Sequence, residues 1–120
     1  MDGRGNSSQL DLAFSALADA SRREVIRLLL QKPRRAGELA ETIQMSPQAL
    51  SRHLRVLRRA GLVREEGIEA DARVRVYSVQ ATAFQPVQQW IGQAEEMWRR
   101  QLGAFKAYAE ALHRSKKAKA

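Results

Sequence analysis

Residues 37–63 read GELAETIQMSPQALSRHLRVLRRAGLV, and this stretch decides the organisation of the chain. A short amphipathic pattern leads into a polar turn at Gln44 and Met45, and a second helical pattern follows at once. Ser46 and Pro47 mark the start of the second helix, because a serine hydroxyl accepts an unpartnered N–H of the first turn and proline suits the first helical position. The stretch therefore predicts a helix-turn-helix.

The second helix of this motif has two chemically different faces. One stripe carries residues at helical spacing, namely Leu50, Leu54, Leu57 and Gly61. The opposite stripe carries Gln48, Arg52, Arg55 and Arg59. Such a helix packs its leucines on a core and presents hydrogen-bond donors outward, where DNA phosphates and guanine edges can accept them. We therefore expect the polar stripe to contact DNA.

The charge pattern supports this interpretation. Between Glu41 and Glu65 the chain has no acidic residue, but it has Arg52, Arg55, Arg58, Arg59 and Arg64. An ordinary solvated helix face mixes both signs, although a basic stripe alone is equally compatible with a surface helix that only aids solubility. The formal net charge of +8 and the pI near 10.8 predict attraction to polyanions, of which nucleic acid is the commonest.

Composition limits the other functional classes. A chain of 120 residues is expected to form one domain with a single core. The absence of cysteine excludes disulfides, thiolate metal sites and a cysteine nucleophile. No apolar run approaches the roughly 20 residues of a membrane span, and residues 1–8 do not resemble a signal peptide, so we expect a cytoplasmic protein without a membrane partner. We find neither a catalytic triad pattern nor a glycine-rich phosphate loop, which argues against an enzyme.

The segments before the motif are expected to be helical. Residues 1–9 are predicted to be a disordered N-terminal segment, and residues 10–17 a short amphipathic helix. Asp19 is the expected N-cap of a helix over residues 20–31, which the segment 32–35 with its proline ends. The expected inward-facing residues of that helix are Val25, Ile26, Leu29 and Leu30. Residues 36–43, with Leu39, Ala40 and Ile43 on one face, form the first helix of the motif.

Two short strands are predicted after the motif, where Gly61 suits a left-handed helix end. Residues 62–66 and 73–79 have strand-like composition and would form a β-hairpin, which beside a helix-turn-helix is the wing of a winged helix. Arg73 and Arg75 project from one strand face and can reach a phosphate backbone or a minor groove, or else form the solvent side of an edge hairpin. Acidic residues near the loop should avoid phosphates unless the loop bends aside: Glu65, Glu66, Glu69 and Asp71.

A long amphipathic helix is predicted over residues 85–113, followed by a basic tail at 114–120. At 1.5 Å per residue this helix is on the order of 40 Å long, which exceeds the width of a domain of this size. Its surplus apolar stripe would be covered by a second copy across a two-fold axis, together with residues 10–17. The expected dimer interface comprises Leu10, Phe14, Leu17, Val87, Ile91, Trp98, Leu102 and Phe105.

The chain resembles the ArsR/SmtB family of bacterial winged-helix repressors. The similarity runs through FSALADASRREVIRLLL at 14–30, GELAETIQMSPQALSRHLRVLRRAGLV at 37–63 and RVRVY at 73–77. It implies a homodimer that leaves its operator when an inducer binds. It also implies major-groove positions for Gln48, Ser51, Arg52 and His53, and a backbone-contacting wing at Arg73. With the polar stripe and the wing, the expected DNA-binding residues are Ser46, Gln48, Ala49, Ser51, Arg52, His53, Arg55, Arg59, Arg73 and Arg75.

The sequence departs from that family where metals are sensed. The first motif helix has no cysteine, and the two histidines, His53 and His113, stand in separate contexts. A tetrahedral site needs four convergent ligands, so we expect no metal site and no cofactor, and the sequence does not identify an inducer.

The sequence thus predicts a mainly helical fold with a small β-hairpin, a dimeric winged helix-turn-helix of order α-α-α-α-β-β-α over residues 10–113. We expect a sequence-specific, homodimeric repressor that binds a quasi-palindromic operator in double-stranded DNA. The alternative is an architectural or protein-interaction module without operator specificity. Gln48 and Arg52 distinguish the two, because their side chains can make bidentate contacts to bases.

Overall fold

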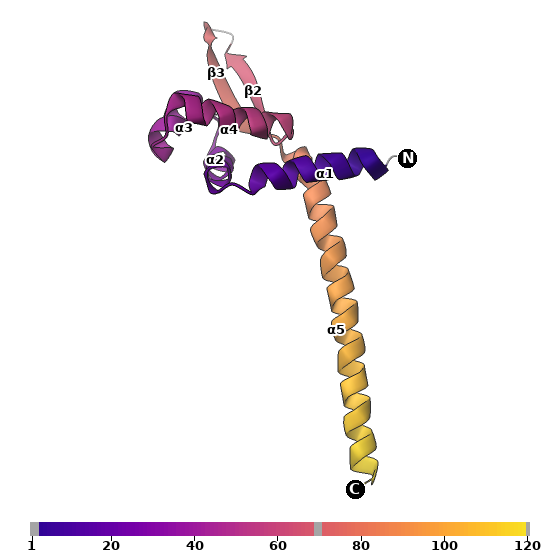
Figure 1. The fold of residues 1–120 in the computed structure, drawn as a ribbon. Helices are drawn as coiled ribbons and strands as arrows, with labels where there is room; N and C mark the ends of the chain where they lie inside the picture. The colour runs from indigo at the N-terminus through magenta and orange to yellow at the C-terminus, as the bar shows by residue number, and fades with distance from the viewer. Residues whose placement is uncertain (1–2, 69–70, 120) are drawn as a thin grey trace. The chain divides into compact units, whose positions relative to one another are not determined.

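The structure is a computed structural model that describes residues 3–68 and 71–119, with side chains from 8 to 68 and from 73 to 118. The chain forms two compact units that divide between Val87 and Gln88. Its elements are α1 (Gly3–Leu17), α2 (Ala20–Gln31), β1 (Arg34–Arg35), α3 (Ala36–Ile43), α4 (Pro47–Arg59), β2 (Val63–Ile68), β3 (Asp71–Val79), the 3₁₀ helix η1 (Ala81–Phe84) and α5 (Gln85–Lys119). Figure 1 shows the helices and the hairpin of the first unit, and α5 as one uninterrupted helix.

The core of the first unit lies where the helices and the sheet meet. Its largest fully buried side chains are Val25, Leu39, Leu50, Leu57 and Leu62. They come from α2, α3, α4 and the segment just before β2, so the apolar faces predicted for the helices converge on one cluster. This burial of apolar area is the main source of stability for the arrangement.

The α2 helix begins as predicted. The side chain of Asp19 accepts a hydrogen bond from the backbone N–H of Arg22 at 3.1 Å, and this bond holds the pKa of the Asp19 carboxyl below its usual value. The predicted inward face was wrong at one position. Leu30 is 66% exposed, and Leu28 is buried in its place.

The two motif helices, α3 and α4, have the predicted bounds and are joined by a short turn. Gln44 adopts a left-handed conformation with φ 62° and ψ 55°, and the N–H of Met45 bonds to the Ala40 carbonyl at 3.0 Å. Ser46 then accepts the N–H of Ala49 on its Oγ at 3.1 Å. These local bonds fix the direction in which α4 leaves the turn.

The end of α4 is also as predicted. Gly61 has a φ of 77°, a conformation that favours glycine, and its N–H bonds to the Arg58 carbonyl at 2.9 Å. The N–H of Leu62 bonds to the Leu57 carbonyl at 3.0 Å, and the chain turns directly into β2.

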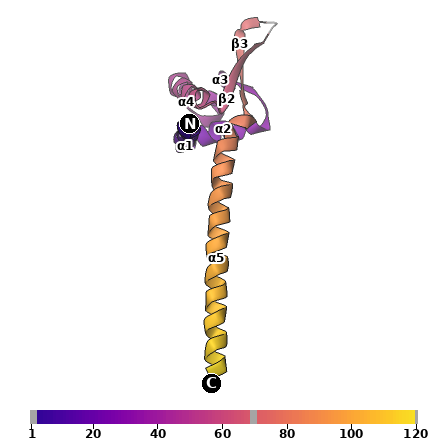
Figure 2. The same ribbon diagram turned by 90° about the vertical axis from the view of Figure 1, so that its right-hand side faces the viewer.

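The sheet has three antiparallel strands in the order β1-β3-β2 rather than the two that the sequence predicted. β1 pairs Arg34 with Tyr77 and Arg35 with Val76, in the segment that was predicted only to end α2. Figure 2 shows β2 and β3 extending as a long hairpin beyond the helices. The predicted wing is therefore present, with its third strand connecting it to the start of α3. Glu69, from the predicted acidic loop, lies outside the described residues.

Two expectations about helix bounds were wrong. α1 begins at Gly3, so residues 3–9 belong to a helix rather than to an unstructured segment. α5 continues to Lys119, so the basic tail is helical as far as that residue. Val87, predicted for a dimer interface, is only 9% exposed because it packs in the core of the first unit.

Candidate nucleic-acid interface

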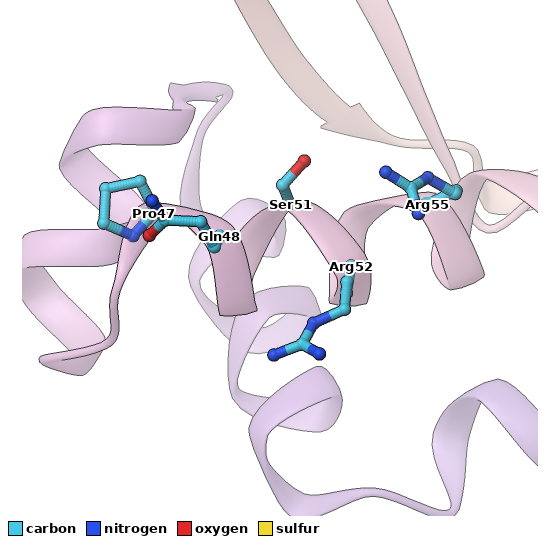
Figure 3. Close-up of a pocket in the computed structure, with 5 residues that line it drawn as sticks. All are labelled: Pro47, Gln48, Ser51, Arg52 and Arg55. Carbon is cyan, nitrogen blue, oxygen red and sulfur yellow. The ribbon is translucent and has the colours of Figure 1, made fainter.

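The exposed face of α4 carries the side chains that the sequence assigned to DNA. Pro47, Gln48, Ser51, Arg52 and Arg55 line one open hollow along this face. Figure 3 shows the Arg52 guanidinium at one edge of the helix, and the Ser51 hydroxyl and the Arg55 guanidinium at the other. The hollow thus presents hydroxyl, amide and guanidinium groups together, which are the donors used for contacts to bases and phosphates.

The arginines of α4 differ in whether a carboxylate neutralises them. In the described part of the chain, no acidic side chain forms an ion pair with Arg52, Arg55 or Arg59. By contrast, Nη1 of Arg58 lies 3.6 Å from Oε2 of Glu65. The outward face of α4 therefore keeps three guanidinium groups that no carboxylate among the described side chains compensates.

His53 is half-buried and has a protein partner. Its Nδ1 lies 3.3 Å from Nη1 of Arg22, whose side chain is 17% exposed. Arg22 also donates through Nε to the Ala16 carbonyl at 2.6 Å and through Nη2 to the Ser15 carbonyl at 3.1 Å. The sequence did not single out Arg22, because nothing local indicates that its partner lies on another helix.

Glu65 on β2 joins the wing to the end of α4. Its carboxylate accepts the hydroxyl hydrogen of Tyr77 at 2.5 Å and lies 3.6 Å from Arg58 and 3.8 Å from Arg75. Burial of the phenol, followed by its bond to the Glu65 carboxylate, raises the pKa of Tyr77 to about 12. Glu65 was predicted to repel DNA from the wing, but in the structure it is engaged by neighbouring side chains.

The predicted wing arginines are both exposed. Arg73 and Arg75 lie on β3 and line a hollow other than the one on α4. The structure thus separates the predicted DNA-binding residues into an α4 group and a wing group.

The α5 helix exposes large apolar side chains. Ile91, Trp98, Phe105 and Leu112 recur every seven residues and are between 45% and 70% exposed. Leu102, also predicted for a dimer interface, is 47% exposed. On α1, Phe14 is 38% exposed, whereas Leu10 and Leu17 are partly buried against the core.

In residues 8–68 and 73–118 we find no group of three or more His, Cys, Asp or Glu side chains placed to hold a metal ion. None of the described helices combines the length and the apolar character needed to cross a membrane.

Comparison with known proteins relates this chain to a family of regulators. Residues 19–65 match the family model for bacterial regulatory proteins of the arsR family. The transcriptional regulator Rv2034 of Mycobacterium tuberculosis is 40% identical over 62% of this chain and 66% of its own length, just under two thirds. The transcriptional activator HlyU of Vibrio cholerae is 32% identical over 64% of this chain and 68% of its own.

A solved structure supports the same assignment. An ArsR-like transcriptional regulator from a Rhodococcus species superposes with a TM-score of 0.73, covering 88% of this chain and 96% of that one at 28% identity. The match spans both the helix-turn-helix sequence and the three-dimensional fold. The chain therefore belongs to the ArsR family of winged helix-turn-helix transcriptional regulators.

Proposed function

We propose that this regulator is a homodimer that binds a quasi-palindromic operator through α4 of each copy and represses transcription there. One observation carries the proposal. The helix that is fixed by the Ser46 cap and by three buried leucines presents Gln48, Arg52 and Arg55 outward with no described carboxylate to neutralise the arginines.

Specific binding requires contacts to bases as well as to phosphates. An arginine can donate two hydrogen bonds to guanine, and a glutamine can bond to adenine through both groups of its amide. Arg52 and Gln48 are one helical turn apart on the exposed face of α4, so both can enter the same major groove. We assign base contacts to these two residues and phosphate contacts to Ser46, Ser51, Arg55, Arg59 and the wing arginines. Ala49, whose N–H is bonded to Ser46 Oγ, is assigned a van der Waals contact only.

The dimer is proposed from the apolar surface of α5. Four large side chains at seven-residue spacing form the seam of paired helices, and leaving them in water would be costly. We include Phe14 of α1 in the interface because it is a large apolar side chain that is exposed in the first unit. Two-fold symmetry then offers two α4 helices to major grooves about 34 Å apart.

Repression is the simplest consequence of such binding. A dimer that occupies a promoter excludes RNA polymerase and needs no additional contact surface to do so. We further propose that the protein acts in the cytoplasm, where its DNA lies. HlyU, a relative, is an activator, so the sign of regulation is tested with a reporter gene placed behind the selected site.

The experiment that tests the proposal is selection of duplexes from a random-sequence library by the purified protein. We expect enrichment of an inverted repeat whose half-sites are centred about 10 base pairs apart. Recovery of bound duplexes without any shared sequence would instead support the alternative, an architectural module without operator specificity.

A further inference from the structure

We propose that the junction of β1 and α3 forms, with β3, a second DNA contact that binds a phosphodiester of the duplex backbone. Arg35 is the residue of this contact that has not yet been assigned to DNA binding. The inference rests on the proposed function and extends it, because it assigns a backbone anchor outside the surface of α4.

Strand pairing builds this site from distant parts of the sequence. Arg35 pairs with Val76 in the β1–β3 ladder, which places it across from the strand that carries Arg73 and Arg75. These three arginines line one cleft with a volume of about 420 Å³. One water molecule needs roughly 10–15 Å³ of space measured in this way, so the cleft has room for a hydrated phosphate group.

The cleft has the chemistry of an anion site. Its lining residues include three arginines and no Asp or Glu. A Cβ built at Gly37, which also lines it, would meet nothing within 4 Å, so bulky groups can approach the backbone there. Guanidinium groups donate paired hydrogen bonds to phosphate oxygens, which makes phosphate the matching ligand class.

The nearby carboxylates contact groups other than the Arg35 guanidinium, which therefore stays available to bind a phosphate. The Glu38 carboxylate accepts the backbone N–H of Arg35 at 3.4 Å, and Oε1 of Glu65 is 3.8 Å from Nε of Arg75. Within the part of the chain whose side chains are described, the Arg35 guanidinium itself forms no ion pair.

The position of the cleft favours a DNA backbone over an isolated anion. The hollow on α4 includes Pro47, a neighbouring hollow includes both Pro47 and Gly37, and the arginine cleft includes Gly37. The three hollows thus share lining residues between α4 and Arg35, and the middle one also includes Glu41. A strand whose bases meet α4 can place a flanking phosphate at Arg35.

The test compares Arg35→Gln with Arg99→Gln, which removes one positive charge from the exposed surface of α5. Affinity for the selected duplex is measured across salt concentrations, together with ethylation interference at each phosphate. Each phosphate contact contributes about 0.9 to the slope of log affinity against log salt. We expect Arg35→Gln to flatten the slope by about 1.8 per dimer and to abolish interference at one flanking phosphate per half-site.

The control variants separate this effect from general loss of charge or folding. Arg99→Gln should keep the wild-type slope and interference pattern, and Arg35→Lys should keep most of the slope because it retains the charge. A wild-type slope with unchanged interference in Arg35→Gln would overturn the cleft assignment while leaving the proposed function in place. If the wild type binds DNA with an affinity that does not change with salt, both the cleft assignment and the proposed function are wrong.

A second arm distinguishes backbone phosphate from the free ion. Inorganic phosphate is added at constant ionic strength, and we expect no change in DNA affinity beyond that seen with chloride. A saturable loss of affinity in the wild type that is missing in Arg35→Gln would assign the cleft to free phosphate and contradict the proposal.

Discussion

Nη1 of Arg22 on α2 lies 3.3 Å from Nδ1 of His53 on α4, and this contact joins the helix before the motif to the helix proposed to enter the major groove. A guanidinium only donates hydrogen bonds, so in a hydrogen bond between these two groups Nδ1 of His53 is the acceptor. Because Arg22 also bonds to the Ser15 and Ala16 carbonyls, one side chain connects α1, α2 and α4.

Two substitutions at His53 test whether this contact positions α4. Asparagine offers a carbonyl oxygen close to the place of Nδ1, whereas leucine offers no acceptor. We expect His53→Leu to lower the free energy of unfolding by about 1–3 kcal/mol and His53→Asn by clearly less. Urea unfolding at one fixed protein concentration makes the comparison, and equal losses in the two variants would contradict the assigned bond.

The Tyr77–Glu65 bond predicts a pH dependence. The folded-state pKa of Tyr77 is about 12, above the ordinary value of 10.0, so the stability it contributes is complete below pH 10 and is lost as the pH rises toward 12. Absorbance titration in a Tyr108→Phe background follows Tyr77 alone. We expect Glu65→Gln to lower the pKa of Tyr77 while burial keeps it above the ordinary value. Identical titration curves would rule out a role for the Glu65 carboxylate.

Dimerisation through α5 is tested by placing a charge on its apolar stripe. Trp98→Glu and Phe105→Glu should convert dimers to monomers or aggregates and weaken operator binding, because each would bury a carboxylate in the interface. Gln93→Glu adds the same charge away from the seven-residue stripe and should remain dimeric. Sedimentation equilibrium measures the mass. A monomeric wild type, or unchanged mass in both stripe variants, would refute the interface.

Release of DNA is predicted to be independent of metal ions, since the chain has no cysteine. Operator binding is measured with micromolar zinc, nickel, cadmium, copper or arsenite, and with a chelator. We expect the same affinity throughout. Saturable release by one of these, lost on changing His53 or His113 while basal DNA binding persists, would reveal a metal site.

Local signals were enough to predict the helix-turn-helix. Ser46, Pro47 and Gly61 act within one helical turn of themselves, so their roles can be inferred from neighbouring residues alone. The third strand could not be predicted in this way. β1 has only two residues, and it is a strand because Arg34 and Arg35 pair with residues of β3 more than forty positions later.

Tertiary packing decided the remaining differences. Leu28 and Leu30 are equally apolar, and only the orientation of α2 against its neighbours determines that Leu28 is buried. Glycines at positions 3 and 5 disfavour a helix by propensity, yet α1 begins at Gly3, ahead of the predicted start at residue 10. The partner of His53 was missed because Arg22 stands 31 residues away in the sequence.

The central claim is that α4 discriminates between base sequences through Arg52, and the most direct measurement is the affinity of Arg52→Ala for the selected duplex and for a scrambled duplex of equal length. We predict a loss of about 1–3 kcal/mol on the selected duplex and a much smaller loss on the scrambled one. Arg99→Ala serves as the charge-matched control and should leave both affinities unchanged. Equal weakening on the two duplexes by Arg52→Ala would identify a phosphate contact and contradict sequence-specific recognition by this residue.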